Sequence, residues 1–75
     1  MSEPLDDLYR TAIRAHQQGR ADEAGRLYDA ILARRPDHPG ALHLKGVLAI
    51  QRGEYPVAAE LIERSLAVEP RHALA

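Results

Sequence analysis

The chain has 75 residues, 45% of them hydrophobic, which predicts one ordered globular domain. Ten basic against eleven acidic residues give a net charge of −1, so charge favours neither nucleic acid nor an anionic membrane as a partner. The absence of cysteine excludes disulfides, thiolate zinc sites and a cysteine nucleophile, and it fits a reducing compartment, so we expect a cytoplasmic location.

Two helices are predicted in the first half of the chain. Pro4 suits a first helical turn, and Gly19 suits a helix end because glycine adopts the left-handed conformation at little cost. Asp22 and Glu23 favour the N-terminus of the next helix, which Pro36 closes. Apolar residues recur at helical spacing in both segments: Leu5, Leu8, Ala12 and Ala15, then Ala24, Leu27, Tyr28, Ile31 and Leu32.

The second half of the chain repeats this plan. Pro39 opens a third helix, Gly53 ends it, Pro56 opens a fourth and Pro70 ends that one. An offset of 34 residues aligns identical residues throughout: Leu8 with Leu42, Ala15 with Ala49, Gln17 with Gln51, Gly19 with Gly53, Ala24 with Ala58, Leu27 with Leu61, Pro36 with Pro70, and His38 with His72. No segment has the alternating pattern of a strand, so the sequence predicts an all-α repeat protein.

These residues resemble the tetratricopeptide repeat family. Small residues stand where the paired helices of that family cross, namely Ala12 with Ala24 and Gly46 with Ala58. Glycine stands in the turn of each repeat (Gly19, Gly53), and a large residue stands in the second helix (Tyr28, Ile62). Proline ends each repeat (Pro36, Pro70). The chain departs from the pattern at Leu8, Leu42, Ala15, Ala49, Thr11 and Lys45, where the family has other large or aromatic residues. The resemblance implies a right-handed helical repeat array, an α-solenoid, with two helix-turn-helix units and the start of a third.

We therefore expect residues 1–75 to form a single domain. Repeat 1 is predicted over about 5–38 and repeat 2 over about 39–72, with 73–75 as the start of a third repeat or a truncated tail.

The two ends of the array differ in polarity. The first helix has a polar side formed by Asp6, Asp7, Arg10, Arg14 and Gln17. The third helix is apolar nearly all round, and the fourth is apolar over about half its circumference. We expect either a longer array or a homo-oligomer, with Leu61, Leu66, Val68 and Leu74 as the candidate self-association face.

The resemblance also implies a concave groove lined by the first helix of each repeat. Carried over to this chain, the groove presents Tyr9, Ile13, His16, His43, Val47 and Ile50. Many family members hold a peptide carboxylate with Lys and Asn there, but the matching positions here are Tyr9, Ile13, His43 and Val47. The chain also contains no Asn and so lacks the asparagine ladder of glycosyltransferase arrays. We expect the groove to take an apolar or helical protein segment.

No cofactor, metal or catalytic site is predicted. The four histidines are not spaced at i, i+3 or i, i+4, so no two share a helix face as metal ligands would. The sequence has no phosphate-binding glycine run, and no nucleophile stands beside a base. We expect the chain not to be an enzyme by itself.

Three functions are compatible with the sequence. The first is a protein-interaction or scaffold module that uses the groove. The second is a substrate-positioning N-terminal domain of a larger transferase, since the phrase "AHQQGR" and the segment around it are similar to repeat regions of larger bacterial transferases. The third is a homodimerisation module. The sequence does not identify the partner.

Overall fold

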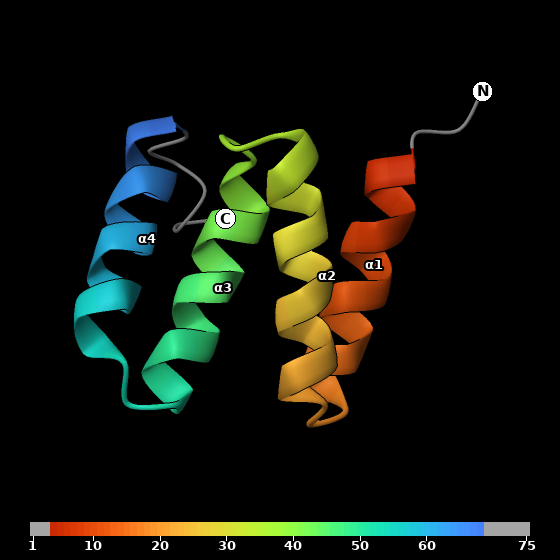
Figure 1. Cartoon of the computed structure of the whole chain (residues 1–75), viewed down its shortest axis with the longest axis horizontal. Helices are drawn as coiled ribbons and strands as arrows, with labels where there is room; N and C mark the ends of the chain where they lie inside the picture. The colour runs from red at the N-terminus through yellow and green to blue at the C-terminus, as the bar shows by residue number, and fades with distance from the viewer. Residues whose placement is uncertain (1–3, 69–75) are drawn as a thin grey trace.

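The computed structural model describes residues 4–68, which form four α-helices and no strand. They are α1 (Pro4–Gln17), α2 (Ala21–Arg34), α3 (Pro39–Gln51) and α4 (Tyr55–Val68). The helices stand side by side in chain order (Figure 1), and α1 packs on α2, α2 on α3, and α3 on α4. The prediction of four helices without strands is confirmed for the part of the chain that the structure describes.

The turns within each helix pair have the same geometry. Gly19 and Gly53 both have φ of +79°, a conformation that glycine adopts without a Cβ penalty. The amide of Arg20 donates to the Ala15 carbonyl at 2.8 Å, and the amide of Glu54 donates to the Ala49 carbonyl at 2.8 Å. Each turn is thus a Schellman-type helix end, repeated after 34 residues as the sequence predicts.

Small residues allow the paired helices to approach closely. Ala12 and Ala24 are fully buried, and Ala58 is 2% exposed. A Cβ placed on Gly46 would lie 2.7 Å from Cγ1 of Ile62, closer than real side chains pack. The predicted burial of Ala24 and Ala58 is confirmed, and Gly46 is needed where α3 meets α4.

The burial of α1 and α3 agrees with the predicted polarity of these two helices. The polar side of α1, from Asp6 to Gln17, is exposed. In α3, only Ile50 and Gln51 are exposed, because α2 and α4 cover it on two sides. Such a helix must be apolar nearly all round, as its sequence is.

Two hydrogen bonds that the sequence did not predict join α4 to the α2–α3 loop and to the first residue of α3. Ser65 is 1% exposed, and its hydroxyl donates to the Pro39 carbonyl at 3.0 Å. The Arg64 guanidinium donates to the Pro36 carbonyl at 3.4 Å. These bonds satisfy polar backbone groups beside a helix start and set where α4 lies against the loop.

Candidate functional site

His16 joins three helices at one end of the predicted groove. Its Nε2 lies 3.2 Å from Oε1 of Gln51 on α3, and its Nδ1 lies 3.2 Å from the hydroxyl of Tyr28 on α2. An amide oxygen only accepts, so Nε2 carries a proton and donates to Gln51. In the neutral imidazole, Nδ1 then accepts from the Tyr28 hydroxyl. These two bonds fix the orientation of the imidazole ring.

Tyr28 is the buried support of this histidine. Its side chain is fully buried, and its ring meets that of His16 edge-on with centroids 6.2 Å apart. Burial, and to a lesser degree the nearby Tyr9, raise the pKa of Tyr28 to about 12. The hydroxyl therefore remains protonated at neutral pH and acts as a hydrogen-bond donor to His16.

Tyr9 packs across the start of α3. Its ring centroid lies 5.0 Å from that of His38, and its hydroxyl occupies the space that a Cβ on Gly40 would fill. Burial raises the pKa of Tyr9 above its usual value. Tyr9 is half-buried and contributes to α1–α3 packing as well as to the groove.

His38 caps α3 through its side chain. Its Nδ1 accepts from the Ala41 amide at 3.0 Å. The His38 side chain is half-buried because it caps the helix and contacts the Tyr9 ring.

The six predicted groove residues form three repeat-equivalent pairs: Tyr9 with His43, Ile13 with Val47, and His16 with Ile50. All are half-buried except Ile50, which is 44% exposed. The hydrogen bond between His16, near the C-terminal end of α1, and Gln51, the last residue of α3, brings these two helix ends together. The six residues thus combine aliphatic side chains, an oriented imidazole and no acidic, Lys or Arg side chain, and their grouping into a groove stays a prediction.

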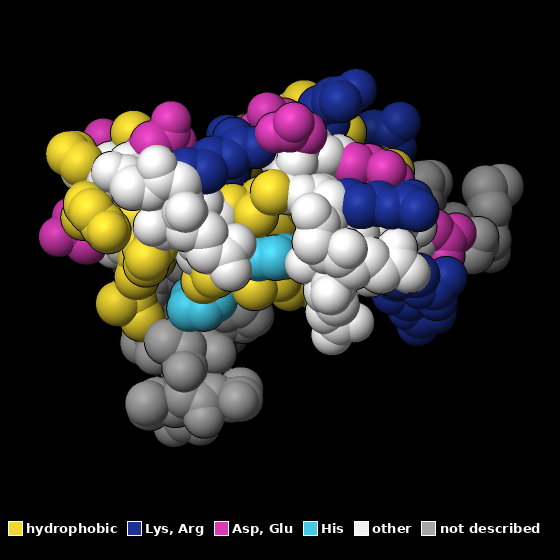
Figure 2. All heavy atoms as spheres, turned by 90° about the horizontal axis from the view of Figure 1, so that it is seen from below, with side chains coloured by type: hydrophobic (Ala, Val, Ile, Leu, Met, Phe, Trp, Pro, Cys, Tyr) yellow, Lys and Arg dark blue, Asp and Glu magenta, His cyan; other side chains and the backbone are white. Residues whose placement is uncertain are grey.

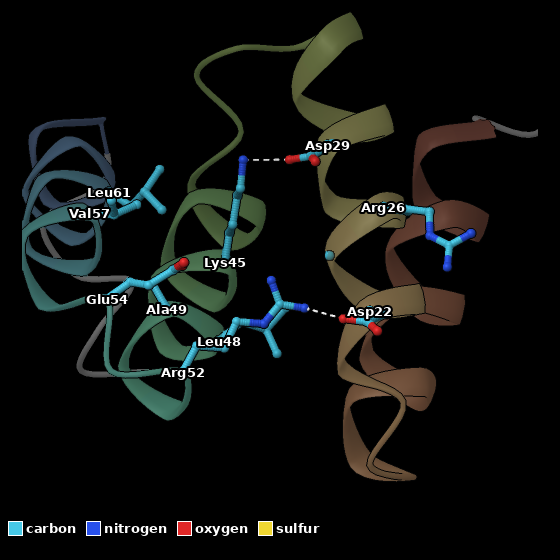
Figure 3. A pocket seen from close by; sticks show the side chains of 11 residues that line it. Asp22, Arg26, Asp29, Lys45, Leu48, Ala49, Arg52, Glu54, Val57 and Leu61 are labelled. Atoms are coloured by element: carbon cyan, nitrogen blue, oxygen red, sulfur yellow. Dashed lines mark hydrogen bonds and ion pairs between the residues drawn. The ribbon is translucent and has the colours of Figure 1, made fainter.

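Charged side chains gather elsewhere. Figure 2 shows Lys, Arg, Asp and Glu along the upper side of the view, whereas the visible histidines lie below them near the centre. The charged side includes a hollow of about 320 Å³ between α2, α3 and α4, which none of the six groove residues lines (Figure 3). Three acidic and three basic side chains line it, so the hollow has no net charge to attract an ion.

Two ion pairs cross from α2 to α3 at this hollow. The Arg52 guanidinium lies 2.6 Å from the Asp22 carboxylate, and Lys45 pairs with Asp29. The two aspartates are seven residues apart on α2, and the two basic residues are seven residues apart on α3. Because the helices are antiparallel, this equal spacing allows two ion pairs to form one after the other along them. Asp22 and Arg26 are spaced at i, i+4 on α2, but Asp22 turns to α3 and Arg26 points away from it (Figure 3). The shared spacing of seven was the signal available in the sequence.

The three described residues of the predicted self-association face, Leu61, Leu66 and Val68, do not form one outward patch. Leu61 is only 7% exposed and lines the hollow beside α3, so it is not part of an outward patch. Leu66 and Val68 are 38% and 44% exposed, but two positions along a helix separate them by about 200°. Leu74 lies outside the described residues. Self-association itself stays a prediction.

Two searches of residues 4–68 gave negative findings. These residues contain no group of three or more His, Asp or Glu placed to hold a metal ion. None of their helices has the length and apolarity needed to cross a membrane.

Comparison with known proteins identifies the family. The tetratricopeptide repeat family model matches residues 15–75, which include the C-terminal end of α1 and all of α2, α3 and α4. A search of curated proteins gave no match. Repeats of this family in general mediate protein–protein interaction and are typically not catalytic. The repeated turn geometry, the small residues at the helix crossings and the family match together show that this chain is an all-α helical repeat protein of the tetratricopeptide repeat family.

Proposed function

We propose that the chain binds an apolar or helical protein segment along the face formed by α1 and α3. The observation that carries the proposal is the exposed Ile50 on α3. It lies three residues after the half-buried Val47, on the same helix face, and the half-buried Ile13 is the repeat equivalent of Val47 on α1. A large aliphatic side chain left 44% exposed gains free energy when a partner covers it.

The polarity of the six groove residues supports a helical ligand over an extended one. An extended peptide leaves backbone groups that need donors and acceptors from the groove, whereas a helix satisfies most of its own. The groove residues offer two imidazoles and a half-buried phenol, and the ring of His16 is already committed to Tyr28 and Gln51. Such a surface suits aliphatic side chains on one face of a partner helix.

A displayed peptide library tests this function. We expect selection on the immobilised chain to enrich peptides with apolar residues at helical spacing. Val47→Glu and Ile50→Glu should each weaken the binding of an enriched peptide at least about tenfold in fluorescence anisotropy, because both place a charge in the apolar contact.

Glu60→Gln is the matched control, since Glu60 is exposed on α4 and outside the groove. It should leave peptide affinity unchanged. Enriched peptides that bind equally well to the Val47 and Ile50 variants would overturn the groove as the binding site.

A further inference from the structure

Within this molecule, α3 packs on α2, the second helix of the first repeat. On α2, the residues Ala21, Gly25, Tyr28 and Leu32 form a stripe in which every member is buried or half-buried. A Cβ on Gly25 would lie 3.9 Å from Cδ1 of Leu48, so this stripe faces α3. Asp29, beside the stripe, pairs with Lys45 of α3.

Three of the four equivalent positions on α4 are uncovered, and the fourth, Ile62, is half-buried where it meets Gly46 of α3. An offset of 34 residues converts the four α2 positions to Tyr55, Ala59, Ile62 and Leu66. Tyr55 is 64% exposed, Leu66 is 38% exposed, and Ala59 is also exposed, whereas the equivalent residues on α2 are half-buried. Among the described helices, α4 is the last in the row, and hydrophobic side chains gather at that end of the molecule on the left of Figure 2.

We infer that this α4 stripe docks an amphipathic helix from another protein, with small and aliphatic residues in contact and one Lys or Arg placed opposite Glu63. The basic residue follows from the repeat offset, because Glu63 stands where α2 carries Asp29, the partner of Lys45. The second acid of α2, Asp22, is replaced by Pro56, so the docked helix needs only one such charge.

A second copy of this chain fits the stripe less well. The α1 positions equivalent to Ala41, Lys45 and Leu48 of α3 are Asp7, Thr11 and Arg14, all exposed and polar, so α1 of another copy offers no apolar face for head-to-tail stacking. In an antiparallel pairing of two α4 helices through this stripe, like flanks meet, so the flank that carries Glu63 faces the same flank of the other copy, which has no basic residue. Neither arrangement gives Glu63 a basic partner.

A peptide of α3 itself is the direct probe, because α3 is the helix that covers the equivalent stripe. We would use residues 38–52 carrying Gly46→Ala, which raises helix propensity at a position that faces α4 rather than α2. NMR titration of the labelled full chain should show shift changes centred on Ala59, Ile62 and Leu66 that saturate at submillimolar peptide, since a short isolated helix must order as it binds.

Substitutions at two positions of similar exposure, Leu66 at 38% and Val68 at 44%, separate the stripe from the rest of α4. Leu66→Glu should weaken peptide binding about tenfold or more, because it buries a charge in the contact. Val68→Glu, on a different flank of the same helix, should change it by less than about twofold. Circular dichroism of both variants establishes that each remains folded.

A charge exchange tests the basic residue. Lys45→Glu in the peptide should weaken binding to the parent about three- to tenfold, and Glu63→Lys in the chain should restore it. Each of four results would overturn the inference. These are no binding of the peptide, shift changes centred on α2, equal loss of affinity in the Leu66 and Val68 variants, and a charge exchange that does not restore affinity. Self-association of the chain that Leu66→Glu abolishes while the peptide fails to bind would also overturn it.

Discussion

At the scale of single residues, one buried hydroxyl orients His16, a residue of the proposed groove. Tyr28 is fully buried on α2, yet it decides the orientation of His16 on α1 because its hydroxyl donates to the imidazole. The sequence identified Tyr28 only as a large residue of the second helix. Ile62 holds the equivalent position on α4 and has no hydroxyl, so the oriented imidazole belongs to the first repeat alone.

The stability of the fold should respond to the ionisation of Tyr28. Its pKa is raised from 10.0 to about 12, so between these values the unfolded chain releases a proton that the folded chain retains. The contribution of Tyr28 is fully present below pH 10 and is lost as the pH rises to about 12. Urea denaturation at pH 8, 10 and 11 should therefore show a steeper fall in unfolding free energy for the parent than for Tyr28→Phe. Parallel pH dependences would contradict this assignment.

At the scale of helices, the sequence predicted the ends well because local chemistry determines them. Gly19 and Gly53 need positive φ, and proline can only enter a first helical turn, so these boundaries follow from single residues. The partners of Asp22, Arg64 and Ser65 could not be predicted in this way. They depend on the register between helices and on where a loop carbonyl lies, which the spacing within one helix does not determine.

Two glycines in helices should respond oppositely to alanine. A Cβ on Gly40 would overlap the Tyr9 hydroxyl, so Gly40→Ala must displace a ring that packs on His38 and should destabilise by about 1–3 kcal/mol. A Cβ on Gly25 would meet only Leu48 Cδ1, at an ordinary 3.9 Å, so Gly25→Ala should stabilise by about 0.5–1 kcal/mol through helix propensity. Urea unfolding measures both changes. Tyr9→Phe should relieve part of the Gly40→Ala cost, and a cost unaffected by Tyr9→Phe would place the clash elsewhere.

At the scale of the whole molecule, two similar helix pairs are joined through α2 and α3. Two ion pairs and the apolar contact of Leu48 join α2 to α3, and a hydrogen bond from His16 to Gln51 adds a link from α1 to α3. The exposed ends of the row differ, with a polar side on α1 and an apolar stripe on α4. Coupling between the repeats therefore depends on the one inner joint, while the ends determine what else the molecule can contact.

Leu48 should contribute more to this coupling than the two ion pairs together. Its side chain is 3% exposed, and truncation of a buried leucine typically costs about 2–5 kcal/mol. The carboxylates of Asp22 and Asp29 are 86% and 59% exposed, and exposed ion pairs are typically worth about 0.2–1 kcal/mol each. A small domain has only about 5 kcal/mol of stability to lose. Leu48→Ala should therefore unfold the chain or leave the two helix pairs with separate unfolding transitions. The double variant Asp22→Asn with Asp29→Asn should keep one cooperative unfolding transition. Hydrogen exchange read separately in α1–α2 and α3–α4 distinguishes these results. A larger loss from the aspartate variant, especially one that disappears in high salt, would mean that charge rather than apolar contact holds the repeats together.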